Sequence, residues 1–275
     1  MTRELPASAL YESPALGRLW KNVYQACSPF LQRPSIRRLY QQPAPLLRKK
    51  LRLPYTCVAL GCADGAKESL LLEKMSPPAC LWTADINLPL ARRAASRLPA
   101  QKRSAYRVDL TTRLPSWFTR LPGPRLITLF GVIPNLDPLP LLRRISRIML
   151  PNDYLLLSAN LAPGRSGLAG TRRILPQYDN EPTRVWLEEA VRRYRPSLPT
   201  GKLVFGVFPD PRQKSLARVE ARWLARTGNW VVFASRRPTS LQVESWIRLA
   251  HLERVARFLD PRGEEGLWLV TAAKA

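Results

Sequence analysis

The 275-residue sequence is poor in the residue types that build many catalytic and metal sites. It holds one histidine, His251, and four cysteines with no Cys-x-x-Cys pair and no histidine near them in sequence: Cys27, Cys57, Cys62 and Cys80. Zinc sites assembled from Cys and His at fixed spacing are therefore not expected. A Ser-His-Asp or Cys-His hydrolase would depend on His251 alone, which lies in an arginine-rich stretch without a nucleophile elbow.

Long apolar runs are also missing. No uninterrupted run reaches the roughly 18 residues needed to cross a bilayer. The amino-terminal segment has no apolar stretch of the secretory type before Glu12 and Arg18. We therefore expect a cytoplasmic protein with no membrane partner. Hydrophobic residues make up 45% of the chain and aromatic residues 8%, which is enough for a packed core and excludes general disorder.

Acidic residues are scarce. The chain has 20 Asp and Glu against 44 Lys and Arg, which gives a formal net charge of +24. A field of this sign favours association with polyanions such as nucleic acids. The alternative is that the basic side chains are spread over solvated helix faces, and we favour it because they are dispersed along the chain. Nucleic acid stays as the disfavoured alternative partner.

Proline is abundant, with 27 residues, and it shapes the amino-terminal segment 1–53. This segment carries ten basic side chains against Glu4 and Glu12, and short helices are expected over 14–27 and 34–41. Prolines interrupt these helices because they cannot continue a helix interior. We interpret residues 1–53 as a basic, proline-rich helical extension that packs against a core.

The pattern changes at Tyr55 to alternating strands and helices. Five apolar runs of strand length occur at 55–61, 81–85, 104–110, 124–133 and 153–161. The segments between them carry apolar residues at helical spacing. Such alternation predicts a parallel sheet with right-handed crossovers, and we assign it to residues 54–162.

The alternation lapses after Leu161. Residues 163–238 predict an amphipathic helix near 182–194, a strand at 202–208, and a hairpin within 215–235 that turns at Thr227-Gly228-Asn229. We interpret this segment as an inserted substrate-binding subdomain.

The closing segment, 239–275, is simpler. It predicts a helix over 239–250 and two strands, 252–259 and 267–273, joined by a turn at Asp260-Pro261-Arg262-Gly263. The two strands would form an antiparallel hairpin that completes the core sheet.

The first strand-to-helix turn carries the first sign of a ligand. Gly61-Cys62-Ala63-Asp64-Gly65 joins the strand to a helix that begins near Ala66. Glycines let the backbone approach a ligand closely, and a doubly wound sheet binds its ligands at the carboxyl ends of its strands. A Gly-x-x-x-Gly turn alone is weak evidence, since any tight turn could use it.

Two aspartates at later strand ends strengthen this interpretation. Asp85 follows Gly61 by 24 positions and ends the second strand, where a carboxylate can accept both ribose hydroxyls. The same side chain could instead cap the next helix, but Asn87 already suits that role. Asp109 ends the third strand, where it could accept the adenine amino group. Together these features predict a nucleoside-binding site.

The glycine spacing narrows the choice of nucleoside. A dinucleotide site usually needs Gly-x-Gly-x-x-Gly to hold a pyrophosphate. Here Ala63 occupies the third position, and no glycine follows Gly65 at the sixth. A nucleoside without a pyrophosphate fits better, and S-adenosylmethionine (SAM) is the common one.

Four stretches carry a family resemblance. LGCADGAKESLLLEKM, LWTADINLPLARRAASRL, YRVDL and LITLFGVIPNLDPLPLLRRISRIMLPNDYLLLSANLAPG, in this order, resemble class I SAM-dependent methyltransferases. The nearest likeness is to the histidine-specific Nα-methyltransferase family of the ergothioneine pathway. It covers roughly residues 55–195 and the last helix–strand–strand, and rests on Lys67, on Gly131 to Asn135, and on Gln177-Tyr178-Asp179-Asn180.

The resemblance implies an α/β, Rossmann-like doubly wound sheet with strand order 3-2-1-4-5-7-6 and an inserted α+β substrate subdomain. It implies an enzyme that moves a methyl group from SAM to a small amine or amino acid, with Asn135 holding the substrate and Tyr178 lining its pocket as candidate catalytic residues. No metal is expected, and we expect a monomer. The implied SAM-binding residues are Gly61, Cys62, Gly65, Lys67, Asp85, Asp109, Leu110 and Gly131.

Three features depart from the family pattern. Ala59 stands where many methyltransferases carry an acidic residue inside the first strand, and Ala63 replaces the middle glycine. FASRRPTSLQVESW, residues 233–246, occupies the region of the glutamate that reads the imidazole. The acceptor therefore need not be histidine. Two alternatives stay open: a nucleic-acid-associated methyltransferase and a non-catalytic, methyltransferase-like binding protein.

Overall fold

The computed structural model describes residues 3–11, 13–112, 114–164, 166–195, 200–226 and 228–273. The chain divides into two compact units. We call Pro34–Asn160 with Ser240–Ala275 the sheet unit, and Met1–Arg33 with Leu161–Thr239 the insert unit.

This division differs from the expected segments at the amino terminus. Residues 1–53 do not form one extension, because the boundary between the units falls at Pro34. Beyond it, Leu39, Tyr40 and Leu47 are at most 1% exposed, and helix α3 (Pro34–Leu39) packs on elements of the sheet unit. The segment after Pro34 is therefore core, not extension. The expected insertion, 163–238, falls inside Leu161–Thr239.

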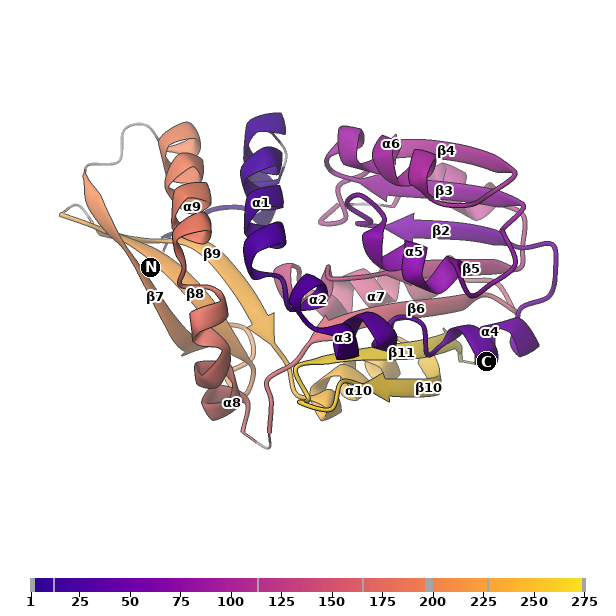
Figure 1. Ribbon diagram of the computed structural model, residues 1–275. Coiled ribbons are helices and arrows are strands. Elements are labelled where there is room, and N and C mark those ends of the chain that lie inside the picture. Colours follow the sequence, from indigo (N-terminus) through magenta and orange to yellow (C-terminus); the bar gives the residue numbers. More distant parts are fainter. Residues whose placement is uncertain are drawn as a thin grey trace. The chain divides into compact units, whose positions relative to one another are not determined.

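A seven-stranded sheet forms the centre of the sheet unit (Figure 1). Its order is β10-β11-β6-β5-β2-β3-β4, in which β2 to β6 run parallel and β10 and β11 form an antiparallel hairpin at one edge. This confirms the expected order 3-2-1-4-5-7-6. The strands are β2 (Thr56–Leu60), β3 (Cys80–Asp85), β4 (Lys102–Arg107), β5 (Arg125–Leu129), β6 (Tyr154–Asn160), β10 (Leu252–Leu259) and β11 (Glu265–Ala272).

Helices cover both faces of this sheet. In Figure 1, α3, α5 and α6 lie on the near face, and α7 and α10 lie on the far face. Every residue of β2 and β5 is buried, as expected for strands covered on both sides. The remaining elements are α4 (Ala44–Lys50), α5 (Ala66–Leu72), α6 (Leu88–Arg97), η2 (Ser116–Arg120), η3 (Ile133–Asn135), α7 (Pro138–Ser146) and α10 (Ser240–Leu249).

The third expected strand, 104–110, is corrected at both ends. In the structure β4 begins at Lys102 and ends at Arg107. Asp109 turns the chain, because its Oδ1 accepts hydrogen bonds from the N–H (2.8 Å) and the hydroxyl (2.7 Å) of Thr111. Asp109 thus lies in a loop two residues beyond the strand.

The fourth expected strand, 124–133, is also shorter. β5 ends at Leu129, because Gly131 adopts a φ of +72° and a 3-10 turn, Ile133–Asn135, follows it. The apolar pattern of the sequence could not show where β5 ends, because the turn that follows the strand also contains apolar residues.

The start of α6 agrees with the sequence. The Asn87 side chain accepts a hydrogen bond from the Leu90 N–H (3.3 Å), and Pro89 lies in the first turn. Asn87 is therefore the helix cap, as predicted, which leaves Asp85 for other contacts.

The insert unit has its own four-stranded sheet, of order β1-β9-β8-β7. β7 (Gly201–Pro209), β8 (Ala217–Ala225) and β9 (Gly228–Arg237) are antiparallel, and β1 (Arg3–Glu4) runs parallel to β9. The β8–β9 pair is the expected hairpin, although Thr227 of its turn lies outside the described residues.

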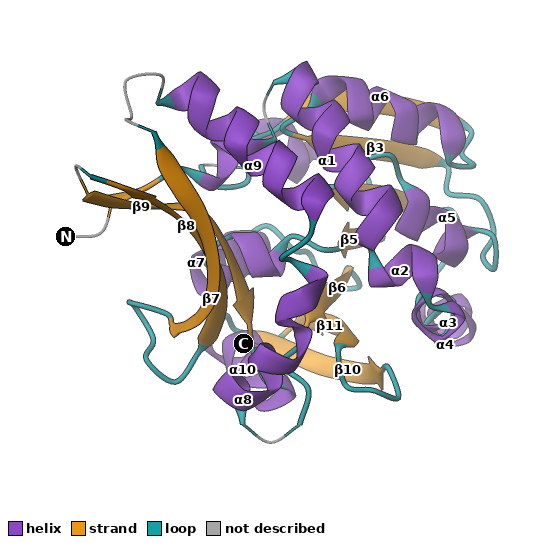
Figure 2. Cartoon of the chain, turned by 60° about the vertical axis from the view of Figure 1, so that its left-hand side comes forward, coloured by secondary structure: helices purple, strands orange, loops and turns teal. Residues whose placement is uncertain are grey.

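Helices α8 and α9 pack on this sheet and α1 packs on α9, as Figure 2 shows for α1 and α9. The helices are η1 (Ala7–Leu10), α1 (Pro14–Cys27), α2 (Pro29–Gln32), α8 (Gly167–Ile174), η4 (Leu175–Gln177) and α9 (Glu181–Tyr194). The buried core between them includes Leu5, Leu10, Leu16, Trp186, Leu187, Leu203, Ala221, Val232 and Phe233.

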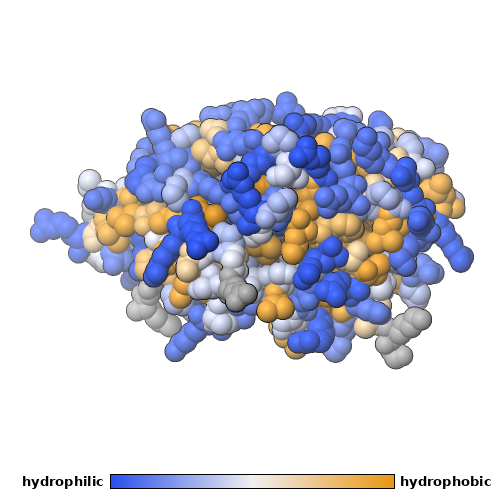
Figure 3. All heavy atoms as spheres, turned by 60° about the horizontal axis from the view of Figure 1, so that its bottom comes forward, coloured by the Kyte–Doolittle hydropathy of each residue, from blue (hydrophilic) through white to orange (hydrophobic). Residues whose placement is uncertain are grey.

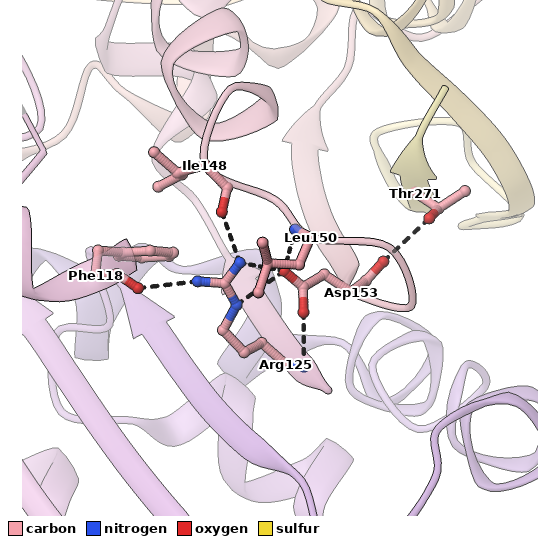
Figure 4. Close-up of polar contacts among 6 residues, drawn as sticks. All are labelled: Phe118, Arg125, Ile148, Leu150, Asp153 and Thr271. Carbon is pink, nitrogen blue, oxygen red and sulfur yellow. Dashed lines mark hydrogen bonds and ion pairs between the residues drawn. The ribbon is translucent and has the colours of Figure 1, made fainter. Parts of the chain in front are cut away.

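A buried ion pair holds together the amino-terminal edge of the parallel strands (Figure 4). Arg125 begins β5, Asp153 precedes β6, and both side chains are fully buried. Asp153 Oδ2 accepts from Arg125 Nε (2.8 Å) and Nη2, and Oδ1 accepts from the Arg125 N–H (2.9 Å). This pair lies at the opposite edge from the strand ends that carry the predicted site.

Part of the positive charge at the surface is paired locally. Exposed arginines pair with acidic neighbours in both units, among them Arg97 with Asp64, Arg184 with Asp179, and Arg254 with Glu244. On the face shown in Figure 3, hydrophilic side chains predominate and apolar ones lie between them.

In the part of the chain that the structure describes, no helix has the length and apolar character required of a membrane span.

Candidate functional site

The turn after β2 is built from left-handed backbone. Gly61, Ala63 and Gly65 have φ values of +60°, +47° and +74°. A side chain at Gly61 is excluded, because a Cβ there would lie 2.4 Å from Val132 Cγ2. The Gly61 N–H donates to the Ala84 carbonyl (2.7 Å), which ties the turn to the end of β3.

The conformation of Ala63 shows how the turn forms without the middle glycine of the family pattern. A left-handed conformation costs a non-glycine residue roughly 1–2 kcal/mol, so alanine is strained where glycine would be relaxed. The Ala63 N–H donates to Asp85 Oδ2 (2.9 Å), and this charge-assisted hydrogen bond offsets part of the strain. The turn therefore keeps a glycine-like shape without the glycine.

Asp85 ends β3 and links two turns. It is 9% exposed, and its Oδ1 accepts from the Asn87 N–H (2.9 Å) while Oδ2 accepts from Ala63. Burial raises the pKa of this carboxyl, and the N–H groups of Asn87, Ala63 and Ile86 act in the opposite direction. A carboxylate has about four acceptor positions, so the Asp85 carboxylate can accept further hydrogen bonds.

The ends of β2, β3 and β4 converge. The Val108 N–H, just beyond β4, donates to the Asp85 carbonyl (2.9 Å). Leu110 Cδ1 lies 3.4 Å from the Cβ position at Gly61, and its side chain is 6% exposed. The sequence predicts Gly61, Asp85 and Asp109 at one edge. The structure brings Gly61 and Asp85 together there, and the residue packed against the Gly61 turn is Leu110, the neighbour of Asp109.

Asp109 contributes less directly than predicted. Its Oδ1 is engaged by Thr111, and its carbonyl accepts from the Thr112 hydroxyl (2.9 Å). The residue stands at the predicted edge but in a loop, and contact with an adenine stays a prediction.

Cys62 and Gly65 shape the turn. A Cβ at Gly65 would lie 3.1 Å from both Ala94 Cβ and Leu98 Cδ1, so glycine lets α6 approach. The Cys62 thiol is 5% exposed, and burial raises its pKa well above the ordinary value, so it stays neutral. Their role toward a cofactor stays a prediction.

A second cluster surrounds Lys67 at the same edge. Lys67 Nζ lies 3.4 Å from Glu265 Oε1 and 3.3 Å from the Cβ position at Gly131, so it reaches the turn after β5. Tyr40 donates its hydroxyl to the same Glu265 oxygen, and Lys67 lies over the Tyr40 ring, 5.0 Å from its centroid. Lys67 and Gly131, both among the implied SAM-binding residues, thus lie close together.

Glu68 supplies a buried acid beneath this cluster. It is 1% exposed, and burial raises the pKa of its carboxyl to about 7, against the influence of Lys67 and of a hydrogen bond from Thr128 Oγ1 (3.2 Å). Thr128 pairs with Ala59 in the adjacent strand. Ala59 stands where many methyltransferases carry an acidic residue. The carboxyl of Glu68 therefore lies close to this position, although Glu68 belongs to α5 and not to the first strand.

The two predicted catalytic residues lie in different units. Asn135 ends the 3-10 turn after β5 in the sheet unit, half-buried, with its N–H bonded to the Val132 carbonyl (3.0 Å). Tyr178 follows η4 in the insert unit, where its hydroxyl lies 3.0 Å from Ser235 Oγ and accepts from Arg237 Nε (2.8 Å).

Sequence reasoning missed Tyr40, Glu265 and Glu68. Tyr40 and Glu265 lie 225 positions apart, and no local pattern connects them. Glu68 had a usable signal, since it precedes the run Leu70, Leu71 and Leu72 directly after the glycine turn.

No cluster of three or more His, Cys, Asp or Glu that could hold a metal occurs in the described ranges.

Comparison with known proteins shows the fold. No protein-family model and no curated protein matches the sequence. In structure the chain is similar to an S-adenosylmethionine-dependent methyltransferase from Clostridium acetobutylicum, with 11% identity, a TM-score of 0.51, and coverage of 94% of this chain and 99% of that one.

A second solved structure agrees. It is the N,N-8-amino-8-demethyl-D-riboflavin dimethyltransferase of Streptomyces davawensis, with 13% identity, a TM-score of 0.51, and coverage of 98% of this chain and 62% of that one. The sheet unit therefore has the Rossmann-like fold of class I methyltransferases.

Proposed function

We propose that the protein is a SAM-dependent methyltransferase whose cofactor is held at the carboxyl edge of the sheet unit. The observation that carries this proposal is the meeting of the Gly61 turn, the Asp85 carboxylate and Leu110 at the ends of three neighbouring parallel strands. Ligands of open α/β sheets bind outside the carboxyl ends of the strands.

The polar groups at this edge fit the two ends of SAM. Asp85 offers a buried carboxylate to a ribose hydroxyl, and Lys67 offers an ammonium to the carboxylate of the methionine part. Glu265 and Tyr40 hold the Lys67 side chain near Gly131. When bound, SAM supplies an electrophilic methyl group on its sulfonium.

The chain's own contribution is alignment. A methyl acceptor must present a neutral nucleophile in line with the methyl group, and fixing such a geometry is worth on the order of 7–11 kcal/mol. Asn135, at the same edge of the sheet, is suited to orient an amine through its side-chain carbonyl. The resemblance around Lys67, Asn135 and Tyr178 supports a small amine or amino acid as acceptor, with histidine one candidate.

The nucleic-acid alternative rests on the net charge of +24. Exposed arginines such as Arg97 and Arg254 pair with local acids, which offsets the positive charge at these places. Since affinity for nucleic acid depends on basic groups gathered along one surface, we prefer a small-molecule acceptor.

The first prediction tests the ribose contact. Asp85→Asn will weaken SAM binding by about 10- to 100-fold, because a charge-assisted hydrogen bond is lost. It will weaken binding of 5′-methylthioadenosine by the same factor, because that ligand keeps the ribose and lacks the amino-acid part. Isothermal titration calorimetry measures both constants.

The matched control for this test is Glu73→Gln, an exposed residue of the same unit that loses the same charge. It should bind both ligands as the parent protein does, and unfolding of the ligand-free variants checks that each is folded. Absence of SAM binding by the parent protein at millimolar ligand contradicts the proposed function.

The second prediction tests the methionine end. Lys67→Met will weaken SAM binding about tenfold or more and leave 5′-methylthioadenosine binding nearly unchanged, because only SAM carries the carboxylate that the ammonium would meet. Calorimetric titration of the two ligands measures the difference.

Lys74→Met removes the same charge from an exposed position nearby and should affect neither ligand. Equal weakening of both ligands by Lys67→Met would place Lys67 away from the methionine part.

A further inference from the structure

A polar cluster in the insert unit has hydrogen-bond donors but no acid. Tyr178 and Ser235 place their hydroxyl oxygens 3.0 Å apart, and Arg237 donates to the Tyr178 oxygen from Nε (2.8 Å) and from Nη2. Arg237 also lies over the Tyr178 ring, 5.1 Å from its centroid. All three residues belong to the insert unit.

Arg237 is buried without a counter-charge. Its side chain is 5% exposed, and within the described residues its hydrogen-bond and ion-pair partners include no carboxylate. A guanidinium stays charged in proteins, and a buried charge that lacks an opposite charge is costly. The tyrosine hydroxyl is neutral and does not compensate it.

Two other arginines of the same sheet, the buried Arg218 and the half-buried Arg236, are compensated. Arg218 lies 2.5 Å from Glu220, and Arg236, the neighbour of Arg237, lies 2.9 Å from Asp210. Among the residues that the structure describes, an acid thus pairs with Arg218 on β8 and with Arg236 on β9 but not with Arg237. This contrast points to an anion that is not part of the chain.

The hydroxyl groups strengthen this inference. Because the Tyr178 oxygen accepts from Arg237, its hydrogen is free to donate to Ser235 or to a ligand. The remaining Arg237 N–H groups and the two hydroxyls form a set of donors that matches an oxyanion. The Phe233 ring, 5.9 Å from that of Tyr178, provides an apolar wall beside them.

We propose that Arg237, Tyr178 and Ser235 bind an oxyanion, a carboxylate or a phosphate. All three residues belong to the insert unit, so this anion site stands independently of the proposed function.

The experiment uses the full-length protein and simple anions as probes. Thermal unfolding is followed with acetate and with inorganic phosphate, each compared with chloride at equal ionic strength. We expect one or both anions to raise the melting temperature of the parent protein above the chloride value, and the stronger one identifies the group. Arg237→Gln will weaken the apparent anion affinity about tenfold or more.

Arg222→Gln is the matched control, since Arg222 belongs to the same sheet and already pairs with Glu220 (2.6 Å). It should keep the anion effect. Because Arg237 lacks a counter-charge, Arg237→Gln should also fold with no loss of melting temperature in chloride, whereas a structural arginine would lose stability on removal.

Two results overturn the proposal: no anion-specific protection of the parent protein, or equal protection of the parent and Arg237→Gln. Calorimetry with SAM separates this proposal from the proposed function, because Arg237→Gln leaves the carboxyl edge of the sheet unit intact. If anions protect the protein but SAM does not bind, the proposed methyltransferase function is contradicted and the oxyanion site is not. If SAM binds but anions do not protect, the oxyanion site is contradicted and the methyltransferase function is not.

Discussion

Arg125→Met will lower the free energy of unfolding by about 3–5 kcal/mol, because it leaves the Asp153 carboxylate buried without its counter-charge. The two side chains are fully buried, and Arg125 also donates to the carbonyls of Phe118 (2.9 Å) and Ile148 (2.6 Å). Asp153 accepts a further bond from the Leu150 N–H (2.7 Å). Removing the guanidinium breaks this network at its centre (Figure 4).

Urea unfolding at neutral pH measures this loss, and a double-mutant cycle with Asp153→Leu isolates the pair. The double variant should recover much of the stability, since replacing both charges removes the unpaired carboxylate. SAM affinity per folded molecule should not change, because the pair lies at the opposite edge of the sheet from Asp85. A loss below about 1 kcal/mol would show that the carboxylate finds water or another partner.

Glu68→Gln will stabilise the protein above pH 7 and leave it almost unchanged at pH 4. Burial raises the pKa of Glu68 from 4.5 to about 7, so the folded state holds the proton more tightly than the unfolded state. The stabilising contribution of the protonated acid is therefore complete below about pH 4.5. It is lost as the pH rises through 7, and the loss is on the order of 3 kcal/mol.

The measurement is the difference in unfolding free energy between Glu68→Gln and the parent protein from pH 4 to 9. This difference should grow over the interval from about 4.5 to 7 and then level off. Glu73→Gln, at the exposed carboxyl end of the same helix, should show no such growth. A flat difference for Glu68→Gln would mean that the carboxylate is ionised in the folded state at little cost.

Much of the sheet unit could be predicted because its signals are local. Apolar runs gave the five parallel strands, and parallel strands must end at the same edge, so Gly61, Asp85 and Asp109 were expected together. The carboxyl ends of the third and fourth strands were wrong, since Asp109 turns the chain through Thr111 and Gly131 turns it through a positive φ. Such turns depend on side-chain and backbone geometry that hydrophobic patterning does not report.

The rest of the site depends on contacts between distant segments. Glu265 reaches Lys67 only because β11 enters the sheet antiparallel to β6 and starts at the edge where the parallel strands end, opposite Asn160. Arg237 is distinctive only by its lack of an acid, and a sequence with 44 Lys and Arg gives no way to choose it. Both facts follow from packing and from burial.

The pairing of β1 with β9 sets an order on folding in the cell. Arg3 and Glu4 lie beside Trp230 and Val231, and the Leu5 N–H donates to the Val231 carbonyl (2.9 Å). A ribosome releases residues 3–5 well before their partners, which emerge only after more than 200 further residues have been made. The parallel strands β2 to β6 can meet in the meantime, whereas the insert unit must wait, and contacts so far apart in sequence form slowly.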